Sequence, residues 1–174
     1  MYISSATILL GLFALSSAGP VVRSKRAGVL TAKPYSEFQI SDGVAGNALA
    51  EVNANFPIDT SDLAGVAASD LEIIQNARVT AEDAETSTGG FDDELADAAD
   101  GTNSTALQNG KIKNKVLKLQ LEVLGLQIQA AQGDSDASQD KIDEETTKLN
   151  SNIALDTAAA GQDSVGVTAT FSGE

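Results

Sequence analysis

Oxygen-bearing side chains recur at alternate positions after residue 133. Hard oxygen ligands with this spacing, closed by a distal carboxylate, are typical of the calcium loop of EF-hand proteins. Gln139 stands where that loop requires glycine, so we expect no metal site and interpret the segment as the acidic start of a helix. Positions one, three, five, seven and twelve of the window are Asp134, Asp136, Ser138, Asp140 and Glu145.

Three lysines fall on one face of a predicted helix and raise the alternative of an anion-binding patch. They are Lys111, Lys115 and Lys118, with Lys113 close to them. The chain carries 25 acidic residues against 11 basic ones. Pairing of these lysines with acidic side chains of neighbouring helices is therefore the expected arrangement.

The composition excludes several kinds of chemistry. The chain has no Cys and no His, which removes Cys-His and Ser-His catalysis and the common zinc sites. Chance carboxylate pairs are unavoidable among so many acids, but Trp is absent and no aromatic platform for a sugar is evident. We expect no enzymatic activity and no cofactor. The net charge of −14 also argues against binding nucleic acid.

The first residues have the pattern of a secretory signal peptide. An apolar run at residues 8–15 is followed by small residues up to Ala18, where signal peptidase would cleave. The run is shorter than the about 20 residues that span a bilayer, so we expect no stable membrane insertion. The prediction is a signal peptide over residues 1–18 and a secreted protein.

Two further motifs fit passage through a secretory pathway. Lys25-Arg26 is a dibasic pair of the type that processing proteases cleave; this predicts a short pro-segment over 19–26 and one mature domain over 27–174. That domain keeps 8 basic and 25 acidic residues, which gives a net charge of −17. Asn103 begins the only N-glycosylation sequon, in a segment whose composition predicts a loop.

Apolar periodicity predicts an all-α fold with four to five helices. A capping box, Ser69 to Glu72, marks one start, and Pro57 and several glycines mark ends. The arm at 27–40 and the tail at 165–171 could form short terminal strands that pair with each other. The predicted helices cover residues 42–55, 69–88, 91–99, 104–131 and 136–160.

The helix near 104–131 is expected to be the centre of the bundle. It has two apolar seams, each with spacings that alternate between three and four residues, so neighbours should cover it on two sides. A tight bundle buries both seams completely, whereas looser packing leaves a slot for an acyl chain along the first seam. The residues of that seam are Leu117, Leu121, Leu124 and Ile128.

Three segments carry a family resemblance: residues 40–59, residues 110–124 and residues 152–162. Together they resemble a family of small, effector-like secreted proteins of filamentous ascomycete fungi. The resemblance implies fungal origin and export, and it implies no catalytic residue. A looser similarity in architecture links the chain to fungal cell-wall mannoproteins and hydrophobic-surface-binding proteins.

Two functions follow as expectations. The first is a secreted, non-enzymatic interaction protein with a protein or cell-wall partner, located outside the cell or on the cell wall. The second is a carrier or surface binder of fatty-acid-like ligands that lie between helices. An apolar cavity in the folded protein would favour the second function, and a bundle without a pocket would favour the first.

Overall fold

The computed structural model describes residues 26–98 and 102–171 of the chain. The fold is all-α, as predicted, with one short antiparallel strand pairing in the described part. Two of the helices are very short, α1 (Tyr35–Phe38) and the 3₁₀ helix η1 (Thr60–Gly65). The other elements are β1 (Gly43–Val44), α2 (Ala48–Asn55), α3 (Ala68–Thr86), α4 (Phe91–Asp97), α5 (Thr102–Ala131), α6 (Gln139–Ala158) and β2 (Asp163–Ser164).

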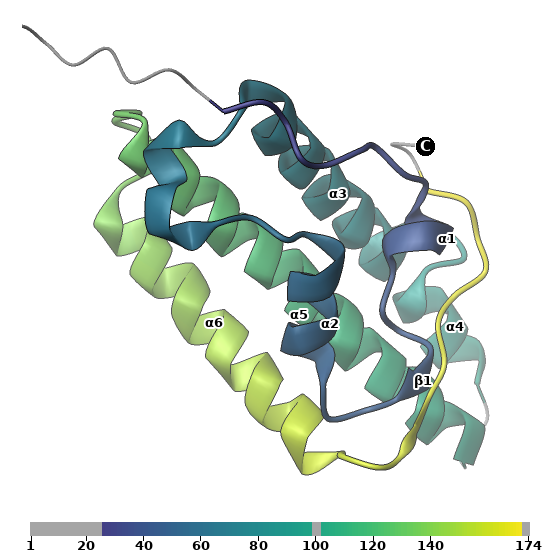
Figure 1. Cartoon of the computed structure of the whole chain (residues 1–174). Coiled ribbons are helices and arrows are strands. Elements are labelled where there is room, and N and C mark those ends of the chain that lie inside the picture. The colour runs from purple at the N-terminus through teal and green to yellow at the C-terminus, as the bar shows by residue number, and fades with distance from the viewer. Residues whose placement is uncertain (1–25, 99–101, 172–174) are drawn as a thin grey trace, which may run out of the picture.

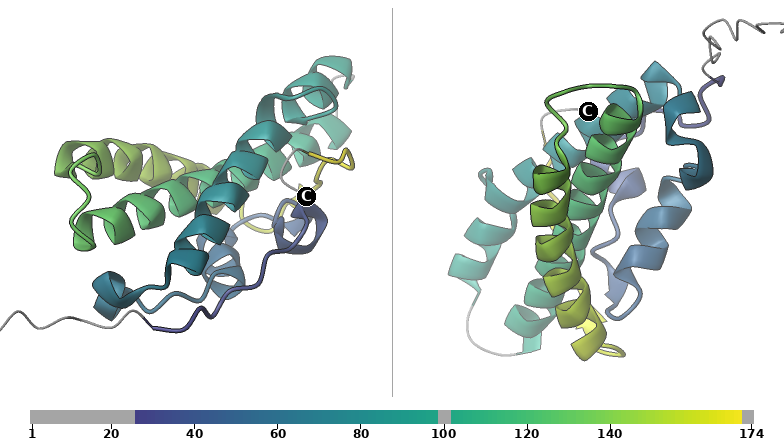
Figure 2. Two further views of the ribbon diagram at one scale, coloured as in Figure 1. Left: turned by 90° about the horizontal axis from the view of Figure 1, so that it is seen from above. Right: turned by 90° about the vertical axis from the view of Figure 1, so that its left-hand side faces the viewer.

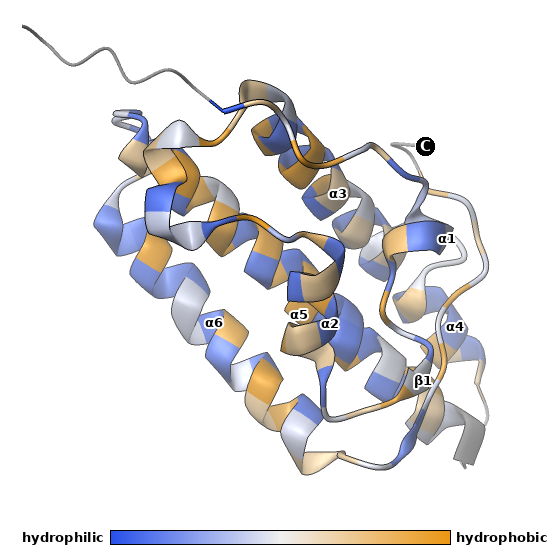
Figure 3. Ribbon diagram, viewed as in Figure 1, coloured by the Kyte–Doolittle hydropathy of each residue, from blue (hydrophilic) through white to orange (hydrophobic). Residues whose placement is uncertain are grey.

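Helix α5 is the centre of the fold, which confirms the prediction made from its two seams. Its 30 residues pack against α3 and α6 along most of their length, and α2 and α4 cover further parts (Figure 1). The first seam is fully buried, and Val116, Leu119 and Val123 of the second seam are buried as well. Hydrophilic residues cover much of α6, which packs on the outside of α5 (Figure 3). No helix in residues 26–98 or 102–171 is long and apolar enough to cross a membrane.

The chain from the N-terminal arm to α2 forms a layer on one side of the long helices, as both views in Figure 2 show. The predicted helix over 42–55 is wrong in its first part, because α2 begins only at Ala48. Gly43 and Gly46 have φ values of 95° and 116°, which no right-handed helix allows. Residues 43 and 44 instead pair with Ser164 and Asp163.

A carboxylate from α6 holds the start of α2. Asp156, only 3% exposed, accepts hydrogen bonds from the backbone N–H groups of Gly46 at 2.8 Å and Ala48 at 2.9 Å. The first N–H groups of a helix have no partner within the helix, and a carboxylate there also faces the positive end of the helix dipole. Asp156 therefore satisfies N–H groups at the start of α2, a role that the side chain of the N-cap residue usually has.

A buried lysine holds the loop before α2 in a similar way. The side chain of Lys113 on α5 is 1% exposed, and its Nζ lies 3.0 Å from a Glu51 carboxylate oxygen. The same Nζ donates to the backbone carbonyls of Asp42 at 3.1 Å and Val44 at 3.2 Å. A buried ammonium is tolerated when it is paired and hydrogen-bonded in this way.

The tail does not form the predicted strand with the arm. The strand pairing lies earlier, between β1 and β2, because Asn109 and α5 bind the chain where it leaves α6. The backbone N–H of Val165 donates to the carbonyl of Ala106 at 3.0 Å, and the Val165 backbone passes over Gly110. Beyond this point the tail packs along the arm through an edge-to-face contact between Phe171 and Tyr35.

Candidate apolar ligand pocket

The N-terminal arm crosses the surface of α3 in an extended conformation, and one buried carboxylate holds it there. Asp70, 2% exposed, accepts from the backbone N–H groups of Val29 at 3.0 Å and Leu30 at 2.9 Å. A Cβ on Gly28 would lie 2.7 Å from the Ser69 hydroxyl oxygen, so glycine permits this close approach. The predicted capping box is therefore wrong: α3 begins at Ala68, its N-cap is Ala67, and no side chain caps it.

The arm is fastened again at its beginning. The Arg26 backbone N–H donates to the carbonyl of Gly65 at 2.8 Å, and its guanidinium lies 2.7 Å from an Asp59 carboxylate oxygen. Hydrogen bonds from Ser61 and from the Arg26 guanidinium lower the pKa of Asp59 to about 2. Arg26, the second residue of the predicted dibasic site, is thus bound to Gly65 of η1 and to Asp59, the residue before η1. Ala18 and Lys25 lie outside the described residues.

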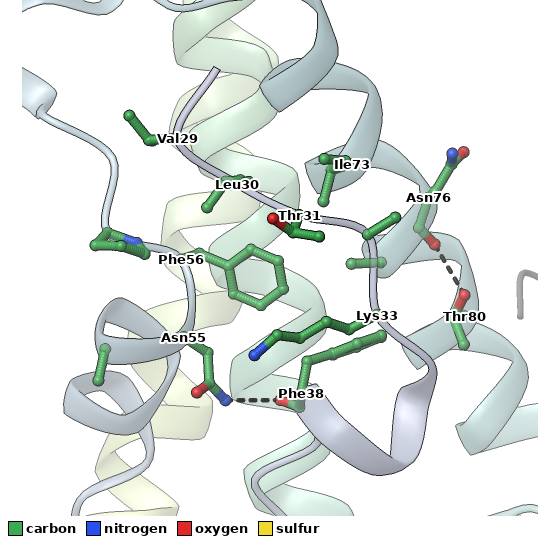
Figure 4. A pocket seen from close by; sticks show the side chains of 14 residues that line it. Val29, Leu30, Thr31, Lys33, Phe38, Asn55, Phe56, Ile73, Asn76 and Thr80 are labelled. Carbon is green, nitrogen blue, oxygen red and sulfur yellow. Dashed lines mark hydrogen bonds between the residues drawn. The ribbon is translucent and has the colours of Figure 1, made fainter. Parts of the chain in front are cut away.

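Between the arm, the end of α2 and α3 lies a pocket of about 270 Å³ (Figure 4). Phe38, Phe56 and Ala77 are buried parts of its wall, and Leu30 and Ile73 are half-buried. This volume is close to the roughly 300 Å³ at the lower end of small-molecule sites. The lining consists of residues 29–33, Phe38, residues 54–57, and Ile73, Asn76, Ala77 and Thr80 of α3.

Aromatic side chains are concentrated at one end of the pocket. Phe38 and Phe56 meet edge to face with ring centroids 5.8 Å apart, and Tyr35 contacts Phe38 from behind at 5.5 Å. The hydroxyl of Tyr35 donates to Asn114 Oδ1 at 2.8 Å, which anchors this cluster to α5. Burial raises the pKa of the Tyr35 phenol, so that side chain is neutral and fixed. The apolar end of the pocket therefore has a rigid support.

Most polar groups of the lining lie at the rim, and Thr80 of α3 is a buried polar residue of the wall. Lys33, Asn55 and Asn76 are exposed at the rim, and the Lys33 side chain extends across the pocket toward Asn55 (Figure 4). Asn55 Nδ2 donates to the carbonyl of Phe38 at 2.9 Å, which joins α2 to the arm. Lys33 is the only ionisable residue of the lining. The pocket has no carboxylate that could act as a general acid or base, so its geometry suits binding.

The sequence placed the candidate ligand face elsewhere. The first seam of α5 is sealed inside the core beneath the neighbouring helices, with exposures of 0%, 1%, 4% and 0% along its length. None of its four residues lines the pocket beside the arm. The residues of this seam are Leu117, Leu121, Leu124 and Ile128.

The lysine face of α5 is paired within the chain. Lys118 Nζ lies 2.6 Å from one carboxylate oxygen of Glu85, and Lys115 Nζ lies 3.3 Å from the other. These two lysines lower the pKa of Glu85 against the opposing effect of its burial. Lys111 pairs with Asp92 of α4. The expected pairing with neighbouring helices is thereby confirmed.

The acidic window after residue 133 is divided between a turn and the first half of α6. The turn is closed by Gly133 at φ 89° and by a bond from the Asp134 N–H to the Gln129 carbonyl, and Ser138 is the N-cap. No group of three or more His, Cys, Asp or Glu side chains that could hold a metal ion is found within the described ranges. Asn103 belongs to the first turn of α5 and not to a loop, and only its backbone is described.

Residues 30–168 match the family described as a domain of unknown function (DUF8454). The chain belongs to the DUF8454 family. No curated protein and no solved structure gives a significant match. The DUF8454 match begins at Leu30, inside the arm, and includes all of the pocket lining except Val29. The pocket is therefore built almost completely from residues within the region that matches the DUF8454 family.

Proposed function

We propose that this protein is a non-catalytic binding protein that holds a small apolar molecule in the pocket beside its N-terminal arm. The observation that carries the proposal is a concave site of about 270 Å³ with two phenylalanines in its wall. Apolar concave sites with a few polar groups at the rim are the usual form of small-molecule sites. This pocket supports the carrier function that was expected from the sequence, but at the arm and not at the first seam of α5. The competing function is the binding of a partner protein to the acidic surface.

The construction of the pocket supports this proposal further. Its outer wall is the arm, which carries no regular hydrogen-bonded structure between Arg26 and α1 and is held by Asp70 and by the Arg26 contacts. An extended segment fastened at few points opens locally more easily than a packed helix, although Leu30 of the arm packs against the core. We therefore expect a ligand to enter beside the arm.

Ligand binding should raise the melting temperature of the protein. At a hundredfold excess over Kd, a ligand that binds only the native state stabilises it by about 2.7 kcal/mol. For a domain of this size, that corresponds to a rise of roughly 5–10 °C in Tm. The measurement is a thermal unfolding series with straight-chain alcohols and carboxylates of increasing length. A rise that grows with chain length, up to a limit set by the pocket, is the expected result.

Two tryptophan variants locate the binding site. Ala54→Trp places a bulky ring in the pocket from the exposed side of α2 and should abolish the ligand-dependent rise. Ala154→Trp puts the same ring on an exposed position of α6, away from the pocket, and should leave the rise intact. If no compound raises Tm in the unmodified protein, the pocket is not a ligand site, and the interaction function takes its place.

Export is a second part of the proposal and is supported by the sequence of residues 1–26. The apolar run, Ala18 and the Lys25-Arg26 pair favour a secreted protein, and the resemblance in residues 40–59, 110–124 and 152–162 favours an effector-like or cell-wall-associated role. Protein secreted from a fungal host should begin near Gly19 or at Ala27, and its mass should fall on deglycosylation if Asn103 is modified. Intact mass spectrometry checks both, with Asn103→Gln as the control. A secreted product that retains Met1 would rule out the signal peptide.

A further inference from the structure

We infer that the ligand of this pocket is an amphipathic anion, a single alkyl chain with one anionic headgroup that binds at Lys33. The inference rests on the proposed function and specifies its ligand class. It combines two observations: the pocket has an apolar, aromatic end, and its rim carries one cation without a partner. An amphiphile matches both features, whereas a purely apolar compound leaves the charge unused.

The state of Lys33 is unusual for this chain. The other basic side chains in residues 26–98 and 102–171 each form an ion pair or a hydrogen bond, whereas Lys33 forms neither. Acidic residues outnumber basic ones by more than two to one, so partners are abundant. A lysine on a surface of this composition would ordinarily meet a carboxylate. Lys33 is instead part of the pocket lining, which contains no acidic residue.

The position of Lys33 fits the role of a headgroup anchor. Its backbone belongs to the arm, and its side chain crosses the pocket mouth above Phe38 and beside Phe56 and Asn55 (Figure 4). The methylene stem can cover the apolar chain of a ligand while the ammonium stays in contact with water. The half-buried Leu30 and Ile73 line the opposite part of the pocket and would contact the alkyl chain.

The charge of the whole protein sharpens this inference. A net charge of −14 repels anions at long range, so preference for an anion over a neutral analogue must come from a local cation. An exposed ion pair contributes modestly, and partial removal of water by the alkyl chain strengthens it. We therefore expect decanoate to bind about three- to tenfold more tightly than decanol.

Titration calorimetry on protein that begins at Gly19, and so keeps the Arg26 contacts, tests this inference with decanoate, decyl phosphate and decanol. Lys33→Met, which keeps the length and apolar character of the stem, should weaken both anions about three- to tenfold and leave decanol unchanged. Lys33→Arg should restore anion binding, and Lys141→Met, at an exposed lysine of α6, should change nothing. Comparison of the two anions shows whether a free carboxylate or a phosphate headgroup is preferred.

Each outcome decides between the two claims. If decanoate and decanol bind equally, or if Lys33→Met has no effect on decanoate, the anionic ligand class is wrong while the apolar pocket stands. If decanol binds more tightly than decanoate, the inference is overturned in the same way. If none of the three compounds binds, both the inference and the proposed function fail.

Discussion

Leu121→Asp is expected to leave the protein unfolded at room temperature. Leu121 lies at the middle of the buried seam of α5 and is 1% exposed, so its replacement removes apolar contacts and places a carboxylate in the core. Loss of a buried leucine side chain alone costs about 2–5 kcal/mol. A buried charge without a partner adds several kcal/mol, or the carboxyl group must take up a proton. The sum approaches the 5–15 kcal/mol of a typical domain.

The matched control is Leu155→Asp on α6. Leu155 is 53% exposed, so the same substitution there should change the free energy of unfolding by less than about 1 kcal/mol. Circular dichroism at 222 nm and a denaturant titration distinguish the two variants. A cooperative unfolding transition for Leu121→Asp close to that of the unmodified protein would contradict the central position of α5.

Gly110→Ala should destabilise the protein by about 3 kcal/mol or more, although alanine is the better helix former. Within a helix, glycine to alanine ordinarily gains about 1 kcal/mol. At this position a Cβ would lie 2.8 Å from the carbonyl carbon of Val165 and closer still to its oxygen. Backbone atoms cannot rotate away as a side chain can, so the tail must leave α5 or the helix must shift.

A second glycine of the same helix provides the comparison. A Cβ on Gly125 would meet only Ile74 Cγ2 at 3.9 Å, which is ordinary van der Waals contact. Gly125→Ala should therefore stabilise the protein by about 0.5–1 kcal/mol. Urea unfolding of both variants measures the change in the free energy of unfolding, which should be negative for Gly110→Ala and positive for Gly125→Ala. Equal stabilisation by both substitutions would show that the tail does not lie against α5 at Gly110.

The helical part of the fold could be predicted from the sequence because it depends on local patterns. Two seams on one helix require covering on two sides, and this alone identified α5 as central. Gly133 ends α5 where its composition predicts, and Pro57 follows the end of α2. Periodicity and terminating residues are properties of neighbouring positions, so no knowledge of distant contacts is needed.

The two wrong helix starts have a common cause, because side chains there or near them bind backbone groups that are far away in the sequence. Ser69 and Glu72 matched a capping box, but α3 begins at Ala68, and the Asp70 carboxylate between them binds the arm some 40 residues earlier. Residues 42–47 matched the start of a helix, but Asp156, Lys113 and the pairing with β2 hold them in another conformation. Local propensity is a weak prior where tertiary contacts compete with it.

The pocket could not be predicted for the same reason. Its wall combines the arm, the end of α2 and one face of α3, and none of these segments has a ligand motif of its own. Two features were nevertheless visible in the sequence: Phe38 and Phe56 are two of the few aromatic residues, and Lys33 has no acid within three positions along the chain. Neither feature has meaning until the fold brings the three segments together.

The bonds that fix the N-terminal layer set the order in which this chain can fold. The residues joined by these hydrogen bonds lie 108 to 124 positions apart in the chain. Asp156 binds Gly46 and Ala48, Ser164 binds Ser41, and Gly166 binds Asp42. During synthesis the N-terminal third therefore emerges long before its partners exist. The α5–α6 hairpin, whose contacts are local, should form early, with the N-terminal layer docking last as a slow step of high contact order. The arm that forms the outer wall of the pocket belongs to this layer, so we expect the pocket to be completed only in that last step.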